Sequence, residues 1–200
     1  NLIKIAPPPG FPVDAGEPKQ WDEIERELGT VLPADYKLLI NLYGRGEFND
    51  LFYLFNPFSS SKRMNLLWHA GIPDCFAEDE ELGRLYPIGS ALERYQLFRA
   101  ENPDLLPFPL FPEPRGLLPL GGNTNGGSAY WQMKVKANDW PLIFIPHGLE
   151  PIEQHTMPVV EFLARWLSGG MPNCFNGAGK HFVNRTDPVF QPVERMGISK

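Results

Sequence analysis

The sequence predicts an α+β domain in which helices pack on one face of an antiparallel sheet. Helical patterns dominate the first part of the chain and return near its end, whereas a run of strand patterns lies between residues 117 and 145. This order of elements is typical of a sheet built from consecutive antiparallel strands. With 200 residues, of which 42% are hydrophobic, the chain is long enough to bury one sizeable core.

The first part of the chain is expected to form an extended arm and two helices. Residues 1–17 hold a cluster of prolines, which favours extended backbone. Apolar residues at helical spacing predict a helix over Pro18–Leu28, where proline suits the first turn and a glycine follows the last. A second helix is expected between Pro33 and Gly44 for the same reasons.

The middle of the chain alternates between strand and helix patterns. The apolar run Leu51–Phe55 predicts a buried strand, Ser60–Ala70 can form a helix, and Leu82–Ile88 can form a further short strand. Ala91–Glu101 is expected to be helical. The proline-rich stretch 103–116 then disfavours regular structure, so it is either a long loop over the core or an insertion.

The last part of the domain is expected to supply most of the sheet. Three strands are predicted at Leu117–Leu120, Ala129–Val135 and Leu142–Ile145. A glycine-rich turn over Gly121–Gly127 joins the first two. A final helix, capped by Thr156, is expected to run through Leu167. The domain is therefore placed at residues 18–170, with 171–200 as an irregular tail.

The apolar positions of these elements define an expected core. The first two helices should pack against a sheet that contains Leu120, Tyr130 and Ile143. Their contributing side chains are expected to be Trp21, Ile24, Leu28, Leu39 and Tyr43.

Composition and charge exclude several classes of protein. The chain has 18 basic and 24 acidic residues, a net charge of -6, which argues against nucleic-acid binding because phosphates require clustered cations. No apolar run is long enough to span a membrane. Cys75 and Cys174 stand alone, so a disulfide scaffold or zinc module is not expected. Reduced thiols favour a cytoplasmic protein.

Catalytic, cofactor and metal sites are not expected either. The glycine-rich run Gly121–Gly127 lacks the lysine and hydroxyl residue of a phosphate loop, and a strand pattern follows it instead of a helix. The four histidines show no metal-ligand spacing. The acidic neighbours of Cys75 would raise the pKa of its thiol. The sequence thus predicts that the protein is not an enzyme.

Two groups of residues are candidates for binding a partner. Glu78, Asp79, Glu80 and Glu81 form the densest charge in the chain, and Asp74 precedes them. Such a block is usually a solvated face, but it can also attract a basic protein. The second group is Trp131 and Trp140, of which Trp140 is expected to be the more exposed because it precedes a proline at a strand edge. Core packing is the alternative interpretation for both tryptophans.

The sequence of the first two helices resembles the N-terminal signature of the SMI1/KNR4 family, in the SUKH superfamily. The matching residues are Trp21, Ile24, Glu25, Leu28, Gly29, Leu32, Pro33, Asp35, Tyr36, Lys37, Tyr43 and Gly44. Farther on, Leu118–Gly121 and the apolar residues of the last helix resemble the sheet and closing helix of the family. Asn123 stands where many relatives carry an aspartate, and Gly127 and Ser128 where many carry an acidic residue.

This resemblance implies a SMI1/KNR4-like fold and a non-enzymatic protein-binding function. Bacterial members of the superfamily are commonly immunity proteins that bind and neutralise polymorphic toxins, often nucleases or deaminases. Fungal members are linked to cell-wall synthesis and signalling. The resemblance therefore favours an immunity protein whose partner is a basic toxin domain. A regulatory scaffold or adaptor is the main alternative, and an enzyme or ligand binder with an aromatic cleft is a third.

Overall fold

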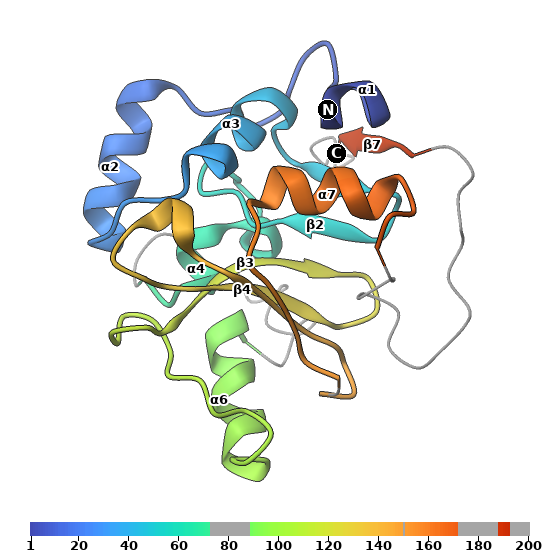
Figure 1. Ribbon diagram of the computed structural model, residues 1–200. Coiled ribbons are helices and arrows are strands. Elements are labelled where there is room, and N and C mark those ends of the chain that lie inside the picture. Colours follow the sequence, from blue (N-terminus) through green and yellow to red (C-terminus); the bar gives the residue numbers. More distant parts are fainter. Residues whose placement is uncertain (73–88, 150, 172–187, 193–200) are drawn as a thin grey trace, which may run out of the picture.

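The computed structural model describes residues 1–72, 89–149, 151–171 and 188–192 (Figure 1). Its α-helices are α1 (Leu2–Ile5), α2 (Pro18–Leu28), α3 (Ala34–Tyr43), α4 (Leu66–His69), α6 (Ala91–Glu101) and α7 (Val159–Leu167). The 3-10 helices are η1 (Lys62–Met64) and η2 (Ala137–Asp139). The strands are β1 (Gly46–Phe48), β2 (Phe52–Leu54), β3 (Leu117–Asn123), β4 (Ser128–Gln132), β5 (Leu142–Ile145), β6 (Glu153–His155) and β7 (Phe190–Pro192).

The strands within these described ranges form one sheet in the order β6-β5-β4-β3-β2-β1-β7. Every neighbouring pair is antiparallel, the strands β1 to β5 each pair with the next strand along the chain, and β7 pairs with β1. This meander accounts for the run of strand patterns, since consecutive antiparallel strands need only short connections. The expected antiparallel α+β fold is confirmed.

Helices cover both faces of the sheet, not one. The ring of Trp131 meets that of Tyr36 on α3 edge to face, with centroids 4.8 Å apart. The neighbouring Tyr130 points to the opposite face, where its hydroxyl donates to the carbonyl of Ala91 on α6 at 3.2 Å. Figure 1 shows α3 and α7 on one side of the strands and α6 on the other. Large apolar residues alternate along β4, so each face needs its own cover.

The composition of the two faces corrects the expected core. Trp21, Leu39 and Tyr43 are buried, as predicted. Ile143, however, is paired directly with Tyr130 and shares the α6 face with it, whereas α3 meets the Trp131 face and Trp21 of α2 packs on α3. A shift of one residue along a strand exchanges the two faces, which is why periodicity alone did not assign them.

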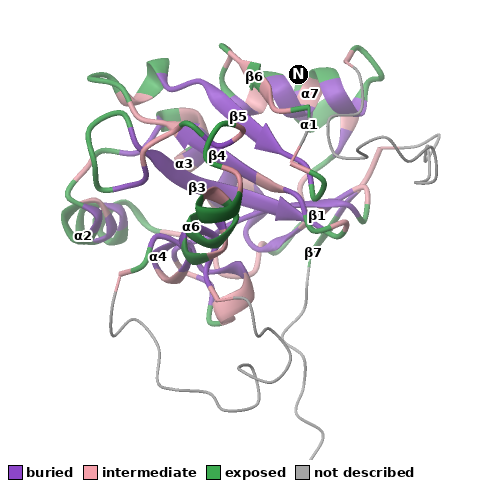
Figure 2. Cartoon of the chain, turned by 90° about the horizontal axis from the view of Figure 1, so that it is seen from below, coloured by how far each residue is buried: buried purple, intermediate pink, exposed green. Residues whose placement is uncertain are grey.

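Figure 2, which views the sheet from the α6 side, shows buried strands behind a helix whose outer turns are exposed. Part of the proline-rich stretch covers the same side. Leu106 and Leu110 are buried, and the hydroxyl of Tyr95 on α6 donates to the carbonyl of Phe108 at 3.1 Å. The stretch therefore packs against the core as an irregular loop.

Local signals positioned the two long surface helices accurately. The helix α2 spans the predicted Pro18–Leu28 and ends at Gly29, whose φ of 65° is in the left-handed region that glycine tolerates. Ser90 caps α6, accepting from Glu93 N–H at 3.3 Å while the Glu93 carboxylate accepts from Ser90 N–H at 2.6 Å. This capping box explains why α6 begins at Ala91.

Other expected elements differ from the observed ones. The arm 1–17 begins with the one-turn helix α1, because the prolines start only after it. The predicted helix Ser60–Ala70 is divided into η1 and α4 at Asn65, whose backbone is extended and whose side chain accepts from Trp68 N–H. The last helix begins at Val159, after Pro158, so Thr156 is not its cap.

Three of the strand expectations also need correction. The strand β3 continues through Asn123, so the turn is shorter than Gly121–Gly127, and β4 ends at Gln132 rather than at Val135. The tail contributes β7, which pairs with β1. The predicted strand Leu82–Ile88 lies outside the described residues.

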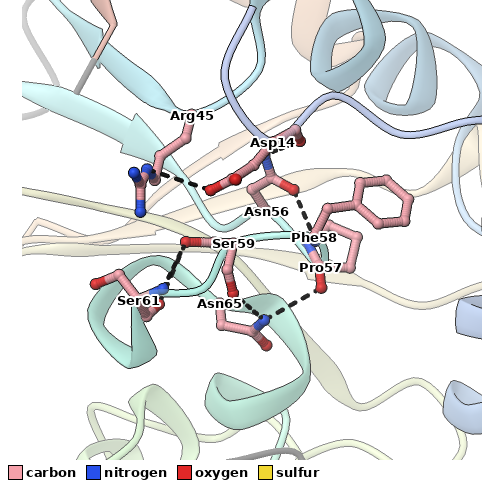
Figure 3. Close-up of polar contacts among 8 residues, drawn as sticks. All are labelled: Asp14, Arg45, Asn56, Pro57, Phe58, Ser59, Ser61 and Asn65. Carbon is pink, nitrogen blue, oxygen red and sulfur yellow. Dashed lines mark hydrogen bonds and ion pairs between the residues drawn. The ribbon is translucent and has the colours of Figure 1, made fainter. Parts of the chain in front are cut away.

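A buried ion pair holds the N-terminal arm to the sheet (Figure 3). Arg45 Nε lies 3.4 Å from the Asp14 carboxylate, and the two side chains are 4% and 10% exposed. Arg45 N–H also donates to the carbonyl of Val13 at 2.7 Å, and the Asn56 amide donates to that of Asp14 at 3.0 Å. The guanidinium Nη2 makes no hydrogen bond within the described part of the chain. A few polar contacts thus fix the arm to the sheet. Loss of either charged side chain would leave the other one buried without its partner.

The loop after β2 has a polar network of its own, also drawn in Figure 3. Asn56 and Asn65 are buried, and the Asn65 amide donates to the carbonyls of Pro57 and Ser59 at 3.1 and 2.8 Å. Asn56 Oδ1 accepts from Phe58 N–H at 2.8 Å. An irregular buried loop has few backbone partners for its own N–H and C=O groups. These side chains supply the missing hydrogen bonds.

Candidate binding site

Of the predicted partner-binding residues, the structure describes only the two tryptophans. Asp74 and the acidic block from Glu78 to Glu81 lie outside the described residues. Trp131 and Trp140 are only 1% and 5% exposed. The expectation that Trp140 is exposed is wrong, because its indole N–H donates to the carbonyl of Lys134 at 2.7 Å and its ring packs against Trp131. The two tryptophans therefore provide core packing and not an aromatic surface.

A polar pocket of about 200 Å³ opens on the α6 side of the sheet. Segments that are distant in the sequence form it: β2, the η1 and α4 turns, the start of α6 and the turn after β3. Its lining residues are Tyr53, Arg63, Trp68, His69, Gly89, Arg94, Asn123, Thr124 and Gly126. Among the residues that the structure describes, two arginines and no carboxylate line it, although the chain as a whole is acidic.

The wall that carries Arg63 and Trp68 is shaped by the break between η1 and α4. The guanidinium of Arg63 lies over the ring of Tyr53, 5.5 Å from its centroid. Asn65 caps α4 and so sets the direction of Trp68, which is partly exposed. One side of the pocket is therefore aromatic and cationic.

His69 forms the floor of the pocket and is fixed in a neutral tautomer. Ala91 N–H donates to its Nδ1 at 3.0 Å, so Nε2 carries the hydrogen, which it donates to the carbonyl of Arg63 at 2.9 Å. Its ring stacks on Phe55 with centroids 3.6 Å apart. Burial, with a smaller contribution from the charge of Arg94, lowers the pKa of His69 from 6.5 to about 3. It is therefore a structural group and not a proton donor near neutral pH.

The histidine makes stability depend on pH. Between pH 6.5 and 4 the unfolded chain binds a proton at His69 that the folded chain does not. As the pH is lowered through this range, the free energy of unfolding should therefore fall by up to about 1.4 kcal/mol per pH unit from this group. We expect His69→Phe to be less stable at pH 7 but to show a shallower decline over this range. Urea unfolding at several pH values measures both slopes, and equal slopes would contradict the assignment.

Arg94 stands at the boundary between this pocket and a smaller hollow lined by Phe98, Tyr130 and His147. Its Nη2 is 3.4 Å from the Ser128 hydroxyl, a long contact. Its Nε is buried and has no hydrogen-bond partner among the described residues. The guanidinium consequently retains unused donor capacity at the pocket.

The turn after β3 forms the opposite rim. Asn123 Oδ1 accepts from the N–H groups of Asn125 and Gly127, at 3.0 and 2.8 Å, and Gly126 has a φ of 83°. The residue that stands where relatives carry an aspartate thus shapes the turn through its carbonyl oxygen. An amide serves here without adding negative charge beside the arginines.

A second, shallower groove of about 390 Å³ lies at the end of α2. The turn around Pro112 and the segment from Met133 to Val135 complete it, and Val135 is fully exposed. Lys134 and Arg115 stand beside Glu113, so the groove has no strong charge preference. The described residues contain no group of three or more acidic, histidine or cysteine side chains placed to hold a metal ion.

Comparison of the sequence with known protein families identifies the family of the chain. A family model described as SMI1-KNR4 cell-wall matches residues 18–164. The chain belongs to the SMI1-KNR4 family. No curated protein and no solved structure gives a significant match. The SMI1-KNR4 match begins with α2 and ends within α7, so it includes the whole polar pocket but neither α1 nor β7.

Sequence reasoning did not identify the residues of this pocket. Arg63 and Arg94 are 31 positions apart, and neither belongs to a recognisable motif. The only local signal was the break between η1 and α4 at Asn65, an N-cap residue within an apparent helix.

None of the described helices is long and apolar enough to cross a membrane.

Proposed function

We propose that this SMI1-KNR4 domain is a non-enzymatic, cytoplasmic protein-binding module that acts as an immunity protein. Its partner is a polymorphic toxin of the nuclease or deaminase type. The family match over residues 18–164 is the observation that carries the proposal. Occlusion of a toxin's active site requires a folded surface and no chemistry of its own.

Charge supports a basic partner. The chain has a net charge of -6, and its densest acidic segment is Glu78, Asp79, Glu80 and Glu81, with Asp74 nearby. A toxin that cuts or modifies nucleic acid needs a basic cleft to hold phosphates. An acidic segment can cover such a cleft, and the attraction accelerates association at low salt.

A regulatory scaffold or adaptor function is the second candidate, favoured by the cell-wall description of the matching family. The two functions predict different neighbouring genes and different fused domains. A toxin gene directly upstream, whose toxicity the chain suppresses on co-expression, supports immunity. A fusion to signalling domains, without rescue from any neighbouring toxin, supports the scaffold.

Reversal of the four charges Glu78 to Glu81 to lysine should slow association with the cognate toxin at least tenfold at low ionic strength. It should also reduce the decline of the rate with added salt, because exposed charges are screened over about 10 Å at 0.1 M. Stopped-flow association at 20 and 300 mM salt gives both quantities.

A matched control reverses four carboxylates on exposed residues of α2 and α6, namely Asp22, Glu23, Glu27 and Glu101. This control changes the net charge equally but should retain more of the rate. If the first variant remains folded and keeps the wild-type rate and salt slope, the acidic segment does not guide binding.

A further inference from the structure

The polar pocket concentrates positive charge in an acidic protein. Arg63 and Arg94 line it, and none of the nine described residues in its lining is acidic. Glu93 lies close by, but its carboxylate accepts from Ser90 N–H in the capping box of α6. The described lining of the pocket is therefore cationic.

Arg94 gives the clearest indication of a missing partner. Its buried Nε is without an acceptor in the described part of the chain, and its one side-chain hydrogen bond, to Ser128, is long at 3.4 Å. A buried donor left unpaired destabilises the folded state, so such groups normally have a partner. An arginine presents several donors in a planar fork, which suits an oxyanion.

Two further polar groups of the pocket, the His69 ring and the Asn123 carbonyl oxygen, already have hydrogen-bond partners. His69 uses both ring nitrogens, and Asn123 uses its carbonyl oxygen within the turn. His69 is neutral near pH 7, so it adds no charge to the pocket. The donors that a ligand would meet are therefore those of Arg94, whose charge persists at every physiological pH.

The size of the pocket restricts what can enter it. Its volume of about 200 Å³ is below the roughly 300–1,000 Å³ of pockets that hold drug-sized ligands and cofactors. Tyr53 and Trp68 add an apolar wall beside the arginines. This combination suits one acidic group on a short stem.

We propose that this pocket binds a single oxyanion group, a carboxylate or a phosphate, with Arg94 as its principal ligand. Arg63 contributes a second charge, and the ring of Trp68 contacts the stem. The proposal is independent of the toxin-binding function. It assigns a small-anion site to the α6 side of the sheet.

NMR titration of the full chain tests the proposal with two probes, inorganic phosphate and N-acetylglutamate, at low ionic strength with constant chloride. We expect the indole N–H resonance of Trp68 and the Nε–H resonance of Arg94 to shift saturably with at least one probe. Saturation with phosphate alone, or with N-acetylglutamate alone, identifies which source of oxyanion the pocket accepts. No saturable shift with either probe would overturn the proposal.

Variants at Arg94 separate the site from general charge effects. Arg94→Gln should weaken binding at least tenfold, and Arg94→Lys, which keeps the charge but loses the fork, should have an intermediate affinity. Arg99→Gln is the matched control, because Arg99 lies on the same helix but does not line the pocket. Binding by folded Arg94→Gln or Arg94→Lys within twofold of the wild type would show that Arg94 is not the ligand.

Discussion

Replacement of Arg45 by methionine is expected to lower the free energy of unfolding by about 3 kcal/mol. The substitution leaves the Asp14 carboxylate in a site where its side chain is only 10% exposed, without the guanidinium 3.4 Å away. Removal of one partner of a buried ion pair typically costs about 3–5 kcal/mol, because the other charge remains desolvated. We expect the lower end of that range because Asp14 retains some contact with water.

The double variant Asp14→Asn/Arg45→Met should recover most of this loss. Both charges are then absent, and the backbone carbonyl at position 14 would still accept from the Asn56 amide as it does in the wild type. Urea unfolding of the two single variants and the double variant measures the coupling energy. The exposed pair Arg165 and Glu161 is the matched control, for which Arg165→Met should cost less than about 1 kcal/mol. Additive effects at Arg45 and Asp14 would show that the pair is uncoupled.

Replacement of Trp21 by alanine should cost about 3–5 kcal/mol, as large truncations in a core do. Trp21 is 4% exposed, and its ring meets those of Tyr36 and Phe58 edge to face at centroid distances of 5.9 and 4.8 Å. Its indole N–H also donates to Asn41 Oδ1 at 2.9 Å. The side chain thus joins α2 to α3 and to the loop after β2.

The variant Trp21→Phe separates ring packing from the hydrogen bond. It keeps most of the apolar contact but loses the donor to Asn41, so a cost of about 1–2 kcal/mol is expected. Thermal and urea unfolding at pH 7 provide the comparison. If Trp21→Ala unfolded within 1 kcal/mol of the wild type, the aromatic contact between α2, α3 and the loop would not stabilise the fold.

Local interactions determine the parts of the fold that the sequence predicted well. The helix α2 combines a proline at its start, apolar residues at 21, 24 and 28, and a glycine at its end, so each signal indicates the same boundaries. The strand β5 coincides with the predicted Leu142–Ile145 because it is a short apolar run between polar turns. The burial of Trp21 likewise followed from helical spacing.

Long-range contacts determine the parts that it did not predict. The indole of Trp140 packs against Trp131 and donates to the carbonyl of Lys134; these partners are near in the sequence, but the contacts depend on the path of the loop between β4 and β5, which no sequence motif indicates. The strand β7 has little apolar character of its own and exists because β1 supplies hydrogen-bond partners. The polar pocket unites residues from positions 53 to 126, which only the folded sheet brings together.

The position of β7 has a consequence for association between copies of the chain. The strand closes the β1 edge of the sheet through backbone pairing and through Phe190, whose ring meets Tyr43 and Phe48 at 5.0 and 4.9 Å. These contacts select a strand of this sequence but do not distinguish the copy that supplies it. Exchange of β7 between two copies would preserve every one of them, so concentrated protein has a route to a domain-swapped dimer whose interface is the native edge of the sheet.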